Sequence, residues 1–112
     1  MSNRIIYLRE ENNKTVGCVA ISTSEDTHYG KTINYQVSVH NPRDLFNKAM
    51  ARQLAIGRLI DSPFKVYADY TNIHDVTYFV MKEIASNKNK LFPSRAIIAA
   101  KCWIKKSGRL TT

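Results

Sequence analysis

The sequence predicts a small α+β domain, in which an N-terminal antiparallel sheet of three to four strands is packed by a central helix and two C-terminal helices. Three observations predict this class. Short β-branched and aromatic runs fill residues 1–40, a long helical pattern follows over 41–60, and one more strand-like run and two helical patterns fill 61–112. With 112 residues, the chain has the usual size of one domain, so we expect residues 1–112 to form a single unit.

Three strands are expected before the central helix. The first covers residues 4–9 and ends at a polar turn, and the second covers the nearly continuous apolar run 15–23, which is typical of a strand with both faces covered. The third covers 33–40 and alternates strictly between apolar and polar residues. Its inner face holds Ile33, Tyr35, Val37 and Val39, and its outer face is polar, with Asn34, Gln36, Ser38 and His40.

The central helix is expected to run from Asn41-Pro42 to about Leu59. Asn41 suits the N-cap, and Pro42 suits the first helical position, where its missing N–H costs nothing. A broad apolar arc, which leaves Ala51 and Ala55 at its edge or outside it, is expected to pack on the sheet. The arc holds Leu45, Phe46, Ala49, Met50, Leu54, Ile56, Gly57, Leu59 and Ile60.

Ser62-Pro63 ends this helix, and a fourth strand is expected over 64–69, followed by a helix from Ile73 to Ala85 with Ile73, Val76, Val80 and Ile84 facing the core. A last helix from Pro93 to Ile104 is apolar nearly all round. Because so small a domain cannot bury such a helix completely, we expect a homo-oligomer through this C-terminal helix. The alternative is that Trp103 covers the edge of a monomer's core.

Seventeen Lys and Arg against nine Asp and Glu give a formal net charge of +8. A positive field favours phosphate-bearing partners, such as a nucleotide, a nucleic acid or an acidic protein surface, although the same charge also keeps a small domain soluble. No apolar run is long enough to cross a membrane, and no export signal is recognisable. The two separate cysteines, Cys18 and Cys102, fit a reducing cytoplasm.

Two arginines of the central helix are candidate ligand-binding residues. Arg52 falls inside the apolar arc, where a buried guanidinium needs an anion: a carboxylate such as Asp44 or Asp69, or the phosphate of a ligand. Arg58 supplies a second cation near the helix C-terminus, where complementing the helix dipole is the plainer explanation. Asn41, at the expected helix start, could seat a phosphate on backbone N–H groups or act simply as a cap.

Aromatic and basic residues are interleaved in the C-terminal half. Tyr78 and Phe92, with Arg95 nearby, fit a base stacked on a ring while a cation holds its phosphate, although Phe92, like Phe79, is equally suited to the core. Arg109, in the basic tail, completes the candidate set because Gly108-Arg109-Leu110 repeats the tripeptide Gly57-Arg58-Leu59.

No sequence motif favours catalysis. Phosphate-binding, dinucleotide, zinc-protease and serine-hydrolase signatures are missing, and the three histidines are scattered. We therefore predict a protein that is not an enzyme and that has no cofactor or metal.

The stretch from Val16 to Leu59 resembles small phage accessory proteins, in which a strand hairpin runs into a characteristic segment, here residues 41–58. This segment follows the pattern N-P-x-D-x-F-x-(K/R)-x-x-(G/A)-R-x-(I/L)-A-x-G-R, read here as Asn41, Pro42, Asp44, Phe46, Lys48, Ala51, Arg52, Leu54, Ala55, Gly57 and Arg58, with Ala51 where glycine is usual. The chain is also similar to the Thoeris anti-defence sponges, which are oligomers with an N-terminal sheet and C-terminal helices. That resemblance implies an oligomer and a nucleotide-type ligand.

Together these features predict a phage anti-defence protein of the host cytoplasm, which binds and sequesters a small phosphorylated signalling nucleotide without cleaving it. The alternative is a basic host-takeover module that binds nucleic acid or a host protein such as RNA polymerase or a nuclease, using the polar sheet face and the loop 87–90.

Overall fold

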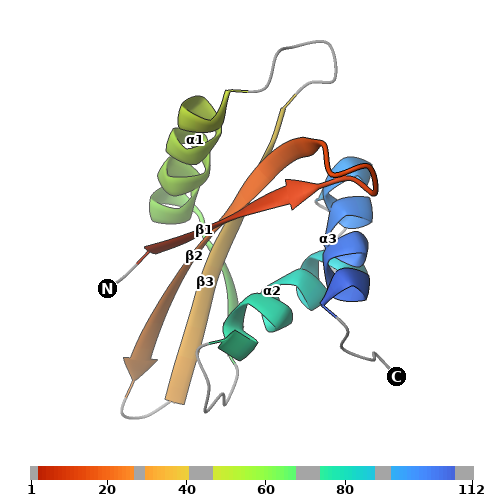
Figure 1. Cartoon of the computed structure of the whole chain (residues 1–112). Helices are drawn as coiled ribbons and strands as arrows, with labels where there is room; N and C mark the ends of the chain where they lie inside the picture. Colours follow the sequence, from red (N-terminus) through yellow and green to blue (C-terminus); the bar gives the residue numbers. More distant parts are fainter. Residues whose placement is uncertain (1–2, 27–29, 41–46, 68–73, 88–91, 108–112) are drawn as a thin grey trace.

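The structure is a computed structural model that describes residues 3–26, 30–40, 47–67, 74–87 and 92–107. Its elements in chain order are β1 (Asn3–Arg9), β2 (Thr15–Asp26), β3 (Gly30–Val39), α1 (Lys48–Asp61), β4 (Phe64–Tyr67), α2 (His74–Ser86) and α3 (Ser94–Lys106). The predicted α+β class is confirmed, including the N-terminal sheet, the central helix and the two C-terminal helices (Figure 1).

The four strands form one antiparallel sheet in the order β1-β2-β3-β4. β2 lies inside the sheet and pairs Val19 with Ile6 on one side and with Val37 on the other. β4 pairs only with the first half of β3, from Thr32 to Tyr35. Consequently β1 is one edge of the sheet, and β4 together with the end of β3 is the other.

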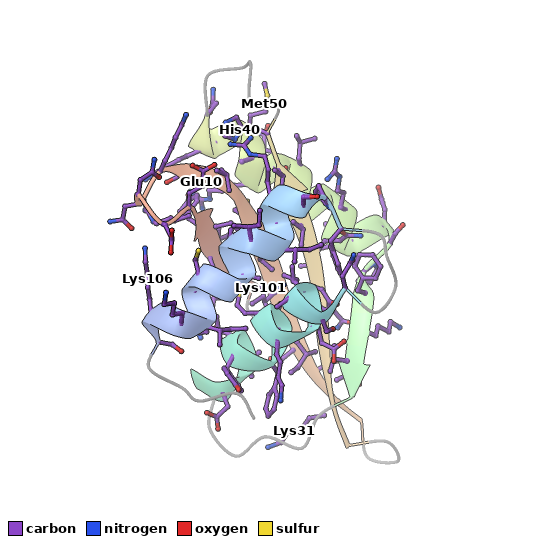
Figure 2. The ribbon with its side chains drawn as sticks, turned by 90° about the vertical axis from the view of Figure 1, so that its right-hand side faces the viewer. Glu10, Lys31, His40, Met50, Lys101 and Lys106 are labelled. Carbon is purple, nitrogen blue, oxygen red and sulfur yellow. The ribbon has the colours of Figure 1, made fainter. Side chains whose placement is uncertain are left out.

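Helices cover both faces of the sheet. α2 and α3 pack on one face and build the larger core, while α1 packs on the opposite face (Figures 1 and 2). β2 sends Val19 and Ile21 to the first core and Cys18 and Ala20 to the second, which confirms that both of its faces are covered. The predicted alternation of β3 is also confirmed. Its side chains in the larger core are Ile33, Tyr35 and Val37, with Val39 packed at the margin.

α1 begins later than the sequence predicted. Its N-cap is Asn47, whose side-chain oxygen accepts a hydrogen bond from the N–H of Met50 at 3.1 Å. The expected start at Asn41-Pro42 was therefore wrong, because a second asparagine six positions later caps the helix. Asn41 itself lies outside the described residues.

The face that α1 turns to the sheet also differs from the prediction. The helix buries Ala51, Ala55 and Leu59, whereas Met50 and Ile60 are 60% and 75% exposed. The small alanines let the helix backbone approach the sheet closely enough for the Cys18 thiol to donate to the carbonyl of Ala51 at 3.3 Å. Close approach, and not side-chain hydrophobicity, therefore decides the orientation of α1.

The two C-terminal helices present one buried face each. The stripe Val76, Val80 and Ile84 of α2 is buried as predicted, and Ile73 lies outside the described residues. α3 buries Ala96, Ala99, Ala100 and Ile104. Its opposite face is exposed and largely basic, so the prediction of a helix that is apolar nearly all round was wrong. Among the described helices, none is long and apolar enough to span a membrane.

Candidate functional site

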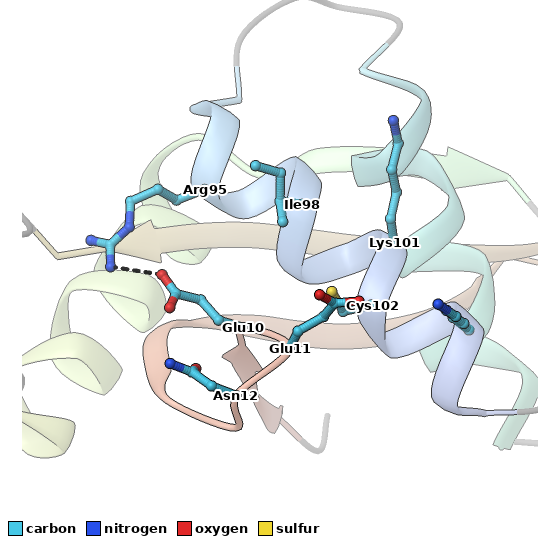
Figure 3. Close-up of a pocket in the computed structure, with 8 residues that line it drawn as sticks. Glu10, Glu11, Asn12, Arg95, Ile98, Lys101 and Cys102 are labelled. Carbon is cyan, nitrogen blue, oxygen red and sulfur yellow. Dashed lines mark hydrogen bonds and ion pairs between the residues drawn. The ribbon is translucent and has the colours of Figure 1, made fainter.

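A hollow of about 580 Å³ lies between the β1–β2 turn and the exposed face of α3 (Figure 3). The turn contributes carboxylates, and the helix contributes cations around an apolar floor. The lining residues are Glu10, Glu11 and Asn12 from the turn and Arg95, Ile98, Lys101, Cys102 and Lys105 from α3. This volume is within the range of small-molecule binding sites.

The acidic side of the hollow is a turn with many local hydrogen bonds. The N–H of Glu10 donates to the carbonyl of Lys14, and the N–H of Asn13 donates back to the carbonyl of Glu10, both at 2.9 Å. Asn13 has a φ of 72°, which asparagine tolerates better than most residues, and the side chain of Asn12 accepts from the N–H of Lys14 at 3.0 Å. These bonds fix the backbone that carries Glu10 and Glu11.

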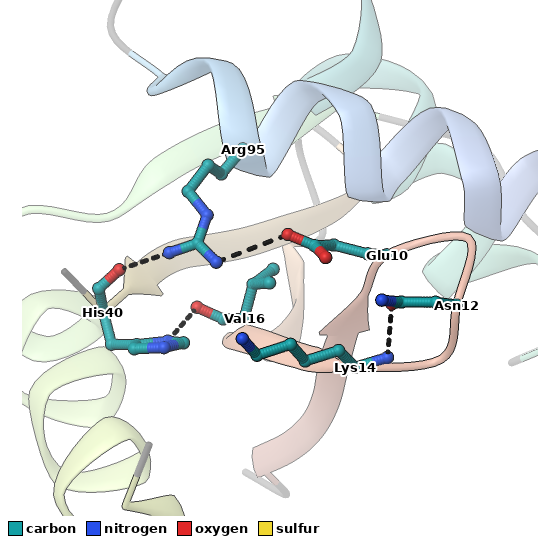
Figure 4. Close-up of polar contacts among 6 residues, drawn as sticks. All are labelled: Glu10, Asn12, Lys14, Val16, His40 and Arg95. Atoms are coloured by element: carbon teal, nitrogen blue, oxygen red, sulfur yellow. Dashed lines mark hydrogen bonds and ion pairs between the residues drawn. The ribbon is translucent and has the colours of Figure 1, made fainter. Parts of the chain in front are cut away.

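Arg95 joins this turn to the end of β3. Its guanidinium donates through Nη1 to the carbonyl of His40 at 2.9 Å and lies 3.4 Å, through Nη2, from Oε1 of Glu10 (Figure 4). His40 is held in turn by its ring Nδ1, 2.7 Å from the carbonyl oxygen of Val16. With its side chain 24% exposed, Arg95 is positioned before any ligand binds.

The remaining cations of the hollow are Lys101 and Lys105. Together with Arg95 and Ile98 they form one stripe on α3, because residues three, four and seven apart share a helix face. Within the part of the chain that the structure describes, neither lysine is in an ion pair. Two cations are therefore available to a ligand beside the Arg95–Glu10 pair.

The structure does not bring the predicted arginines together. Arg95 lies in the hollow, whereas Arg58 donates through Nη1 to the carbonyl of Val37 at 2.9 Å, at the β3 edge of the sheet beyond the end of β4. Arg52 is exposed, so its predicted burial was wrong, because α1 turns Ala51 and Ala55 to the sheet instead. Arg109 lies outside the described residues.

The two predicted stacking aromatics are not in this hollow. Phe92 is 9% exposed, and its ring centroid lies 5.1 Å from that of Phe64 and 6.2 Å from that of Tyr35, so it belongs to the core. It also borders a smaller hollow of about 440 Å³ that includes Arg58. Tyr78 is partly buried on α2, with Nζ of Lys82 5.9 Å from its ring centroid.

The polar face of β3 is less accessible than the sequence suggested. α1 covers it, Ser38 is 4% exposed, and the side chain of Gln36 donates to the carbonyl of Ser62 at 2.8 Å. This face therefore offers less exposed polar surface than the sequence suggested, with Asn34, Gln36 and His40 only partly exposed. Of the loop 87–90, only Asn87 is described.

Burial lowers the reactivity of the Cys18 thiol. The pKa of the Cys18 thiol is raised to about 11 by desolvation, against a smaller opposing effect of Arg52. Both cysteines are free thiols. Over the described residues, no cluster of three histidine, cysteine, aspartate or glutamate side chains is arranged to hold a metal ion.

Of the eight residues that line the hollow, the sequence identified only Arg95, and it missed the other four charged ones: Glu10, Glu11, Lys101 and Lys105. The spacing of the two lysines with Arg95 on one helix face was a visible signal, whereas the approach of the turn to α3 depends on tertiary packing. Comparisons with models of known protein families, with curated proteins and with solved structures find no significant match to this chain.

Proposed function

We propose that this protein binds a small phosphorylated molecule of the nucleotide class in the hollow beside α3 and holds it without cleaving it. One observation carries the proposal: a helix face with three cations lines a hollow of suitable volume, and one of the three is already fixed by Glu10. Positioned cations are the general means of holding phosphate in a binding site.

The mixed charge of the hollow favours a ligand that is both anionic and rich in hydrogen-bond donors. Lys101 and Lys105 suit a phosphate, and the carboxylates of Glu10 and Glu11 suit the amino groups of a base or the hydroxyls of a ribose. Ile98, which is 56% exposed, offers an apolar surface for a ring. A nucleotide has all of these groups, whereas inorganic phosphate has only the first.

The resemblance of the segment 41–58 to phage accessory proteins suggests the biological setting. In this setting the protein is a phage anti-defence factor of the host cytoplasm that removes a signalling nucleotide by sequestration. Tight binding without turnover is the property required.

Binding is tested by titrating cyclic dinucleotides and cyclic ADP-ribose isomers in calorimetry and thermal-shift assays. The double variant Lys101→Gln/Lys105→Gln should weaken binding at least about tenfold, because each lysine contributes a charge-assisted contact. The matched control is Lys65→Gln, which removes an exposed lysine of β4 that does not line the hollow.

Mass spectrometry of the ligand released by heat should show it intact. If none of these compounds stabilises the protein, or if Lys101→Gln/Lys105→Gln binds as well as Lys65→Gln, the proposal is wrong.

A different surface favours the second candidate function, binding to a host protein. The outer face of α1 exposes Met50, Leu54 and Ile60, which is unusual for three large apolar side chains on one short helix. Leu54→Ser should weaken binding to purified host RNA polymerase in biolayer interferometry if this face is used. Gel shifts at low and high salt test the nucleic-acid alternative, since such complexes weaken steeply with salt.

A further inference from the structure

The two edges of the sheet are protected very differently. β4 has only four residues, follows Pro63 and carries the exposed Lys65, which are three common protections of an edge strand. Beyond β4, the backbone of Val37 is occupied as well: its N–H donates to the side chain of Gln36 at 3.0 Å, and its carbonyl accepts from Arg58 at 2.9 Å.

β1, the opposite edge, has fewer of these protections from Asn3 to Leu8, where Arg4 is its exposed charged side chain. It has seven residues, contains no proline or lysine, and has its only irregularity between Leu8 and Arg9. Its centre is Ile5-Ile6-Tyr7, and these three side chains are partly exposed. An edge strand of this composition pairs readily with another strand.

The alternation of the ladder identifies the free backbone groups. The N–H of His40 donates to the carbonyl of Val16, so the even-numbered residues of β2 bond to β3 and the odd-numbered ones bond to β1. With the register of β1 on β2, the N–H and C=O groups of Ile5 and Tyr7 then point away from the sheet. Among the described residues, none bonds to them.

A second hollow, of about 340 Å³, lies at this edge. Its lining includes Tyr7, which packs toward α1, and Trp103, which packs on the core of the opposite face. Arg9 and Asn13 also line this hollow, so it lies where β1 enters the turn. Among the described residues, no strand pairs with the outer edge of β1, and Trp103 is partly exposed beside Tyr7.

We propose that β1 pairs antiparallel with β1 of a second copy of this chain, so that two sheets join across a two-fold axis at Ile6. In this register Ile5 of each copy lies opposite Tyr7 of the other, and the outward N–H and C=O groups of both residues are paired. Aromatic and β-branched residues form favourable cross-strand pairs.

The order of side chains along β1 suits a second copy as the occupant, because the two-fold register avoids contacts between like charges. The register places Arg4 opposite Leu8 and Arg9 opposite Asn3, so no two arginines face each other although each chain carries a net charge of +8. The interface is thus self-complementary, which is what a two-fold dimer requires. It also differs from an interface built on α3 alone, and it does not depend on ligand binding.

The test is the mass of the full chain in solution, measured by sedimentation equilibrium over a range of concentrations. Ile5→Pro removes an outward N–H and leaves the ladder with β2 intact, so it should raise the dimer dissociation constant at least about tenfold. Lys65→Pro is the matched control, because the register of β4 also directs that N–H outward, on the protected edge. It should leave the constant unchanged.

Hydrogen exchange of the unmodified protein keeps the test decisive if Ile5→Pro does not fold. The amides of Ile5 and Tyr7 should become protected as protein concentration rises, while other edge amides do not change. A monomer at concentrations up to about 100 μM would overturn the proposal, and so would a folded Ile5→Pro variant that dimerises like the natural chain.

Discussion

Gly17 is the position where one added methyl group should damage the fold most clearly. It lies in β2 opposite Val39, and a Cβ there would overlap the carbonyl oxygen of Ser38 and lie 2.9 Å from the Cα of Val39. Both are backbone atoms of the neighbouring strand, so relief requires β2 and β3 to separate locally. We expect Gly17→Ala to lower the free energy of unfolding by about 3 kcal/mol, the upper end of overpacking costs.

Gly57 supplies the matched control. It lies in the middle of α1, and a Cβ there would meet nothing within 4 Å. Because glycine is a poor residue inside a helix, Gly57→Ala should raise the free energy of unfolding by about 0.5–1 kcal/mol. The same chemical change is therefore expected to have opposite signs at the two glycines.

Thermal unfolding followed by circular dichroism measures both effects. For a chain of this size about 1 kcal/mol corresponds to about 4 °C, so Gly17→Ala should melt about 12 °C lower and Gly57→Ala about 2–4 °C higher. The reasoning is refuted if Gly17→Ala melts within about 2 °C of the natural chain, or if Gly57→Ala is the less stable of the two variants.

Urea unfolding should show that Leu59→Ala lowers the free energy of unfolding by about 2–4 kcal/mol, because Leu59 is buried between α1 and the sheet. Ile60→Ala, at a site 75% exposed, should change it by less than about 0.5 kcal/mol. Equal effects would contradict the orientation of α1. In thiol labelling at pH 8, the partly exposed Cys102 should react and the buried Cys18 should react only after unfolding. Burial, together with the charge of Glu83, raises the pKa of Tyr35 to about 12. The folded pKa values of Cys18 and Tyr35 exceed their ordinary values of 9.0 and 10.0, so the folded state favours the protonated thiol and phenol. This contribution to the free energy of unfolding is complete below pH 9 and is lost as the pH rises toward 11–12. Urea unfolding that is no easier at pH 11 than at pH 8 would contradict this.

The elements that were predicted well have a simple periodicity. The alternation around Tyr35 and the continuous apolar run through Val19 each have one strand interpretation, and the structure confirms both. The orientation of α1 was missed because a ranking by hydrophobicity places Met50 and Leu54 inside. Packing against small sheet residues such as Cys18 favours alanine there instead.

The candidate site was predictable only in its helical part. Arg95 was identified from its basic and aromatic surroundings, but its partner Glu10 is 85 positions away in the sequence, and no local pattern links the two. The contact of Arg58 with the carbonyl of Val37 was not predictable either. It is possible because β4 is too short to pair with the end of β3, and sequence patterns rarely define the length of a strand so closely.

The thin contact between α1 and the sheet has a consequence for how the protein opens. Two alanines and Leu59 meet Cys18 and Ala20, with Ile5, Tyr7 and Ile56 partly buried around them, so less apolar surface is buried there than in the core under α2 and α3. Since local unfolding starts where least surface is buried, α1 should detach from the sheet at a lower free energy than global unfolding. A macromolecule bound to the outer face of α1 would therefore be attached to a helix that can transiently detach from the rest of the protein.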